Sequence, residues 1–148
     1  MQTTHRYDPE QSEQNADLIR RYHEVTAGDF DTADQILADD VRVHGVFDGD
    51  ETSGIDEFTD QMAAINEAFT DFHVEVHDVV AQADGGASRW TVTGTFEGEF
   101  DGIEPNGAEQ TNPGLTMFRI EDDRIVEIWD REDTYGAMQQ LGALPADA

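Results

Sequence analysis

The chain has 148 residues, with 34 Asp and Glu against eight basic residues, no cysteine, and a formal net charge of -26. The absence of cysteine excludes disulfides, thiolate nucleophiles and Cys-based metal sites. The strong negative charge argues against nucleic acid or an anionic membrane as a partner. No apolar run reaches the ~18 residues that predict a membrane span.

The charge also indicates the solvent for which the chain is suited. All eight basic residues are Arg, and Lys is absent. High net charge favours disorder, but eight Phe, two Trp and regular apolar periods favour a folded domain. Near molar salt the Debye length falls to ~3 Å, which screens the repulsion. The polar stretch 1–14 lacks the pattern of a secretory signal. We therefore expect a cytoplasmic protein from a salt-in halophile.

Apolar spacing predicts three helices in the first half of the chain. Asp8-Pro9 is typical of a helix cap followed by proline at the first helical position. A helix-spaced stripe follows and ends at Gly28; its members are Leu18, Ile19, Tyr22, Val25 and Thr26. A short helix is expected over 32–38. The third helix carries a second stripe, formed by Phe58, Met62, Ile65 and Phe69.

The pattern then changes to the alternation of strands. One early strand is expected over 41–47, before a turn at 48–50. Later strands are expected over 72–80, 87–100, 115–120 and 125–130, joined by turns at 84–86 and 122–123 and by a loop over 101–113, with a final helix over 134–141. This order predicts one α+β domain over 1–148, with loose tails at 1–11 and 145–148. Its curved antiparallel sheet would wrap on three to four helices and enclose a pocket.

The strand that ends in Trp129-Asp130 carries the clearest sign of chemistry. With a period of two, Val126, Ile128 and Asp130 share one face, and Ile125, Glu127 and Trp129 share the other. If the first face lines a pocket, Asp130 is a carboxylate among hydrocarbon. Its pKa would then rise toward the range in which a carboxyl group moves protons at neutral pH.

Several segments resemble one family. The run from Gly28 to His44, the Phe69-Thr-Asp-Phe72 element, the segment from Gly94 to Gly107 and the stretch from Ile120 to Asp130 are similar to the SnoaL-like polyketide cyclases (ester cyclases). These belong to the cone-shaped superfamily of nuclear transport factor two. The similarity spans nearly everything from Asn15 to Leu144.

The resemblance implies a reaction for Asp130, which falls on the position of the family's general acid/base. That reaction is an intramolecular aldol closure, without metal or cofactor, on a small apolar or aromatic ligand that contains a carbonyl. A structural alternative is an Asp that caps the following helix or pairs with Arg131. Such carboxylates also arise in structural pairs.

Other residues are candidates for the same pocket. His44 either looks into the cavity, where it would orient a carbonyl or hold Asp130, or lies on the surface. We expect the substrate to be bound by an aromatic and methionine set, which otherwise forms core: Tyr22, Phe58, Met62, Trp90, Phe96 and Met117. His73 and His77 share a strand face ~13 Å apart, too far for one metal ion, so no metal site is expected.

Departures from the family pattern limit the assignment of a substrate. Phe96 stands where the family usually has His, and 111–114 replaces an aromatic-containing segment with one that contains Pro113, which suggests a bend or an edge. Three hypotheses remain: a cofactor-free cyclase or isomerase, a carrier of an apolar molecule, and an assembly module. We expect a homo-oligomer, either a dimer or a tetramer.

Overall fold

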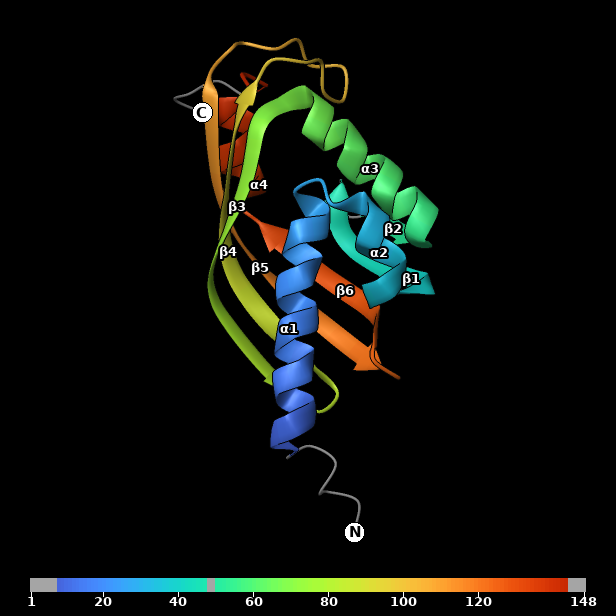
Figure 1. Ribbon diagram of the computed structural model, residues 1–148. Coiled ribbons are helices and arrows are strands. Elements are labelled where there is room, and N and C mark those ends of the chain that lie inside the picture. The colour runs from blue at the N-terminus through green and yellow to red at the C-terminus, as the bar shows by residue number, and fades with distance from the viewer. Residues whose placement is uncertain (1–7, 48–49, 144–148) are drawn as a thin grey trace.

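The computed structural model describes residues 8–47 and 50–143 (Figure 1). Four α-helices, a short 3-10 helix and six strands follow one another in these residues. The first half contains α1 (Pro9–Thr26), η2 (Phe30–Thr32), α2 (Ala33–Ile36), β1 (Leu37–Phe47), β2 (Asp50–Ser53) and α3 (Ile55–Ala68). The second half contains β3 (Phe69–Gln82), β4 (Gly85–Phe96), β5 (Glu109–Glu121), β6 (Arg124–Glu132) and α4 (Thr134–Gln140). No helix of this part of the chain is both long and apolar enough to cross a membrane.

All six strands form one sheet in the order β2-β1-β6-β5-β4-β3. The second half is the expected antiparallel meander, but β1 pairs with β6 in parallel, so the sheet is mixed. The short β2 was not expected; it pairs with β1 beyond a turn predicted at 48–50, most of which lies outside the described residues. The parallel pair sets His44 beside Trp129 and so brings the early strand to the edge of the candidate site.

The helices α1 and α3 both lie on the concave side of the curved sheet (Figure 1). The predicted stripe of α1 is buried along its length, and Phe58 and Met62 of α3 join it. The sheet contributes apolar side chains from β1, β5 and β6, among them Val41, Phe118 and Ile128. The core therefore joins α1, α2 and α3 to the inner face of β1, β5 and β6.

Most of the helix ends that the sequence predicts agree with the structure to within a few residues. Asp8 Oδ1 accepts a hydrogen bond from the Gln11 backbone N–H at 3.1 Å, so Asp8 caps α1. Because α1 begins at Pro9, the last three residues of the expected tail 1–11 are helical. The short helix ends at Ile36 rather than Ala38, since Leu37 already begins β1.

A β-bulge in β6 corrects the predicted faces of that strand. Arg119 pairs with Glu127, but the next residue of β5, Ile120, pairs with Ile125, so Val126 is an extra residue. Ile125 therefore faces the core together with Ile128, instead of sharing a face with Glu127 as expected. The faces beyond the bulge are as predicted, with Ile128 and Asp130 inward and Glu127 and Trp129 outward.

Pro113 lies within β5 at the place where its neighbour β6 ends. Pro113 pairs with Thr91 of β4, and the last β6 residue, Glu132, pairs with Gly114. The Pro113 carbonyl accepts from the Asp133 N–H just past β6, so its ring nitrogen faces that same side of the strand. The edge alternative of the prediction is wrong, because β5 lies inside the sheet between β6 and β4; Pro113 instead stands at the end of the β5–β6 pairing, opposite Asp133.

Candidate functional site

A pocket of about 330 Å³ opens between α1, α3, α4 and the inner face of β3 to β6. Most of its wall is apolar, and this wall includes Met62, Ile65, Phe69, Phe72, Val74 and Leu141. Polar side chains enter it mainly from β4, β5, β6 and α1. A mostly apolar cavity with a few convergent polar groups is typical of small-molecule sites.

Asp130 enters the pocket from β6 and is only partly open, toward the cavity. Its Oδ1 accepts a short hydrogen bond from Thr116 Oγ1 at 2.6 Å. Burial raises the pKa of Asp130 to about 6, against the Thr116 hydrogen bond and the nearby Arg131 charge, which both lower it. The carboxyl group is thus poised to gain or lose a proton near neutral pH.

Gly45 of β1 is what allows the backbone to approach Asp130 so closely. It lines the pocket and has φ of 92°, in the region that favours glycine. A Cβ at this position would collide with the backbone carbonyl of Asp130 and with the Arg131 guanidinium. The parallel pairing of β1 and β6 at the site therefore requires glycine.

Tyr22 of α1 places a phenol in the pocket wall. Its ring is buried, packs edge-to-face on Phe118 at 5.0 Å between centroids and stacks on Phe58 at 5.8 Å. Burial, and then the Asp130 charge, raise the pKa of Tyr22 well above its usual value, so the hydroxyl stays protonated. No described residue hydrogen bonds to this hydroxyl, which leaves it free to donate to a ligand.

His23, beside Tyr22, also lines the pocket. The structure buries it, with Nε2 2.8 Å from Ser88 Oγ. Burial lowers the pKa of His23 to about 4, so the ring is neutral at physiological pH. It contributes a polar but uncharged side chain to the pocket wall.

Glu132 is a second pocket carboxyl group that sequence reasoning missed. It lies two residues after Asp130 on the same strand, and Asn112 Nδ2 donates to its Oε2 at 2.9 Å. Much of the side chain is exposed, yet packing at the pocket and the Asp130 charge raise its pKa. The signal was available, since the period of two that places Asp130 inward also places Glu132 inward. Asn112 Oδ1 is buried and has no hydrogen-bond partner in the described part of the chain.

The predicted substrate-binding residues divide into three groups. Tyr22, Met62 and Trp90 line the pocket. Phe58 and Phe96 are fully buried and do not line it; Phe58 packs under Tyr22, and Phe96 stacks on Phe69. Met117 was placed wrongly: it lies on the outer face of the sheet, 58% exposed, because its cross-strand partner is Trp129 while Thr116 is the residue opposite Asp130.

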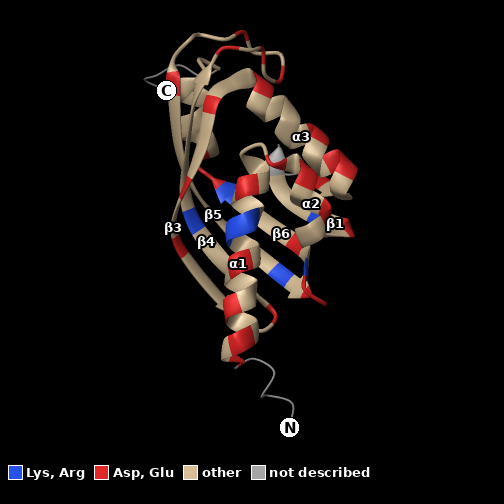
Figure 2. Cartoon of the chain, viewed as in Figure 1, with Lys and Arg blue, Asp and Glu red and all other residues tan. Residues whose placement is uncertain are grey.

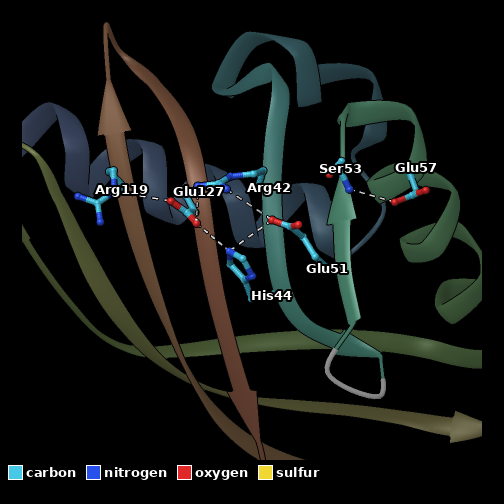
Figure 3. A network of polar contacts seen from close by, with 7 residues as sticks. All are labelled: Arg42, His44, Glu51, Ser53, Glu57, Arg119 and Glu127. Atoms are coloured by element: carbon cyan, nitrogen blue, oxygen red, sulfur yellow. Dashed lines mark hydrogen bonds and ion pairs between the residues drawn. The ribbon is translucent and has the colours of Figure 1, made fainter.

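His44 does not look into the pocket. Its Nε2 lies 2.7 Å from Glu127 Oε2, and its ring stacks on Trp129 at 5.5 Å between centroids. Arg42 also reaches Glu127, at 2.9 Å, and Figure 3 shows this network on the sheet with Glu51 and Arg119 around it. The inward hypothesis for His44 is corrected by the register of β1 and β6, which pairs it with an outward residue.

The histidines of β3 form no metal site in the described residues. His77 Nε2 lies 2.8 Å from Thr91 Oγ1 on an exposed surface. Across the described ranges no three His, Asp or Glu side chains gather in a way that could hold a metal ion.

Comparison with known families gives a match over most of the chain. A family model described as SnoaL-like polyketide cyclase matches residues 16–141. A comparison with curated proteins finds no match.

Solved structures share the fold. The chain is similar to a proposed SnoaL-like polyketide cyclase from Jannaschia sp. CCS1, with a TM-score of 0.80 and 24% identity over 90% of this chain and 95% of that one. It is also similar to IdmH, a proposed polyketide cyclase from Streptomyces antibioticus, with a TM-score of 0.73 and 29% identity over 87% and 99%. AclR, a proposed hydroxylase from Streptomyces galilaeus, has a TM-score of 0.73 and 26% identity over 93% and 98%.

These neighbours carry different proposed activities on one architecture, so the fold does not fix the reaction. The curved six-stranded sheet with its four α-helices matches the cone of the SnoaL-like structures. With the family model matched from residue 16 to residue 141, the chain belongs to the SnoaL-like polyketide cyclase family.

Proposed function

We propose that the protein is a cofactor-independent enzyme that moves a proton at the carbon next to a carbonyl, with Asp130 as general acid and base. The observation that carries this proposal is a carboxyl group in a largely apolar pocket, whose pKa burial raises to about 6. At pH 7 such a group is ionised in about ten molecules of eleven, and its conjugate acid is still strong enough to return the proton.

The reaction is an intramolecular aldol closure or the related isomerisation. The Asp130 carboxylate takes a proton from the carbon next to one carbonyl, and the resulting enolate attacks a second carbonyl of the same molecule. A carbon–carbon bond forms, and the new alkoxide takes the proton back from Asp130. The product is an isomer of the substrate, so no other reactant is consumed.

Tyr22 supplies a donor for the charge that develops on oxygen. Its hydroxyl stays protonated beside Asp130 and has no partner among the described residues. A phenol in a low-dielectric pocket is suited to hydrogen bond to an enolate oxygen, where a preorganised donor has a large effect. Enolisation next to this donor would need less free energy than in water.

The lining of the pocket limits the charge of the substrate. Its ionisable side chains include three acids, Asp101, Asp130 and Glu132, and none of the described lining residues is Arg. An anionic substrate would be repelled, so we expect a neutral dicarbonyl compound of apolar or aromatic character.

Exchange of 2-tetralone protons in D₂O tests the proposal, because this neutral bicyclic ketone has acidic protons next to its carbonyl. The wild type should speed deuterium uptake, measured by mass spectrometry, and Asp130→Asn should lose about 10²–10⁴-fold of that acceleration. Equal acceleration by both proteins would contradict the proposal. Binding of the ketone without exchange in either protein would instead favour a carrier.

We also propose that the folded state requires salt near the molar range. Acidic residues are spread over α1, α3 and the loops rather than gathered in one patch, as Figure 2 shows, so repulsion acts across the whole molecule. The melting temperature should rise steeply from dilute buffer to molar KCl. An equal melting temperature in both would overturn the halophilic assignment.

A further inference from the structure

A chain of three side chains on neighbouring strands links Trp90 and Asp130, which both line the pocket, through Thr116 behind the pocket wall. Trp90 Nε1 of β4 donates to Thr116 Oγ1 of β5 at 2.8 Å. Thr116 Oγ1 donates in turn to Asp130 Oδ1 of β6 at 2.6 Å. Trp90 and Thr116 are 6% and 1% exposed, so water does not compete for either bond.

The direction of this chain is fixed by the chemistry of its first member. An indole N–H can only donate, so it occupies a lone pair of the Thr116 oxygen. Since the Thr116 oxygen accepts from the indole N–H, its single hydroxyl hydrogen points away from Trp90 and is donated to Asp130. Asp130 Oδ1 therefore always accepts, and no described residue hydrogen bonds to Oδ2.

We propose that Trp90 and Thr116 are positioning residues that fix Oδ2 of Asp130 as the atom which takes the substrate proton and returns it. The inference rests on the proposed function of Asp130, since it assigns the reactive oxygen of that base. The bond to Oδ1 restrains rotation of the carboxylate, which favours one direction of the Oδ2 lone pairs toward the substrate.

Gly114 supports the assignment from an independent direction. It is the cross-strand partner of Trp90, and a Cβ at position 114 would collide with the indole ring. Glycine weakens a strand interior and often marks a place where another group approaches closely. Here it provides the space in which the indole reaches Thr116.

Other titratable groups surround Asp130 and must be separated from it in any test. Tyr22 and His23 face the pocket from α1, Asp101 lines it from the loop after β4, and Glu132 and Arg131 follow Asp130 on β6. His23 is already neutral at physiological pH. Glu132 also has a raised pKa, so the ionisation of Asp130 must be followed by its own signal.

The test combines carbon-13 NMR of the Asp130 carboxyl carbon with the pH dependence of 2-tetralone exchange, both in molar KCl. The Thr116 hydrogen bond holds the Asp130 pKa down, so Thr116→Val should move the NMR titration and the acidic limb of the rate profile upward together, by roughly one pH unit. Thr116→Ser, which restores a hydroxyl, should return both to wild-type values. Trp90→Phe, which keeps Thr116, should move both the same way by less.

The inference would be overturned if the Asp130 titration stayed at its wild-type pH in both Thr116→Val and Trp90→Phe. This holds even if the exchange rates of both variants fell equally at every pH, because an equal fall at every pH indicates a packing defect. Should Thr116→Val fail to fold, Trp90→Phe gives the same reading with Thr116 intact. Failure of the proposed function looks different: Asp130→Asn would then exchange 2-tetralone as fast as the wild type. The NMR titrations do not depend on turnover and separate the two cases.

Discussion

Two carboxylates three residues apart on β6 meet opposite environments. Glu127 faces outward, where it binds His44 at 2.7 Å and Arg42 at 2.9 Å. The His44 hydrogen bond has the largest effect and lowers the pKa of Glu127; burial, the next largest, opposes it, and the Arg42 charge adds to the lowering. Asp130 faces the pocket, where burial raises its pKa to about 6.

The difference shows what turns a carboxylate into a base. Glu127 is held in its charged form by cationic or potentially cationic partners, so it has little tendency to take a proton. Asp130 has one neutral donor, Thr116, and an apolar surrounding, so its charged form is less favourable and its proton affinity is higher. The face of the strand, rather than the type of residue, separates the acid held in ion pairs from the acid that we propose as the base.

The largest expected effect is on catalysis, and it tests whether only the carboxylate that faces the pocket acts as a base. Asp130→Asn should lose about 10²–10⁴-fold of the acceleration of 2-tetralone exchange. Glu127→Gln is the matched control on the same strand and should stay within about threefold of the wild type, since Glu127 does not touch the pocket. Equal losses in the two variants would show that β6 as a whole, not the pocket face, is needed.

Gly45→Val should disrupt the junction that creates the pocket face. The added side chain collides with the Asp130 backbone and the Arg131 side chain, which should cost about 3 kcal/mol or more of unfolding free energy in a KCl-buffered denaturation. Gly102→Ala is the control, because Gly102 also has positive φ but nothing within 4 Å of an added Cβ. Similar losses at both positions would mean that backbone strain, not crowding at Asp130, sets the effect.

A smaller effect concerns stability and its pH dependence. Because the folded pKa of Asp130 is raised, its favourable contribution is complete below about pH 4 and is lost as the pH rises through about 6. Asp130→Asn should therefore be more stable than the wild type by about 3 kcal/mol at pH 7, and the gain should vanish near pH 4.

Glu127→Gln should behave in the opposite way. The folded pKa of Glu127 is lowered, so its contribution is present above the unfolded pKa and is lost as the pH falls through the folded pKa. The variant should be less stable than the wild type at pH 7, and the two should converge in acid. Melting curves across pH measure both slopes, and parallel slopes would contradict the assigned environments.

Much of the fold follows from local patterns in the sequence. The stripe through Leu18 and Tyr22, the cap at Asp8 and the turn at Asp122 and Asp123 were each predicted from neighbours in the chain. Both turn residues have positive φ, 51° and 59°, as a tight hairpin of matching twist needs. The parallel pairing of β1 with β6 was not predictable in this way, since its partners are more than 80 residues apart and no turn joins them.

The site residues also divide into those that a local pattern predicts and those whose position depends on a distant strand. Asp130 could be predicted from the alternation of one strand, and Glu132 would have followed from the same rule. His44 and Met117 were misplaced because their positions depend on register with another strand: His44 pairs with Trp129 from β1, and Met117 pairs with it from β5. Thr116 escaped notice because a buried hydroxyl gains meaning only from its partners in space.

The pH dependence of 2-tetralone exchange by the wild type tests the central claim most directly. If Asp130 is the base, the rate should rise with pH to a half-maximum near pH 6, in step with the carbon-13 titration of Asp130, and this rise should be absent in Asp130→Asn. A rate that does not change between pH 5 and pH 7, or one that follows a titration other than that of Asp130, would contradict the account.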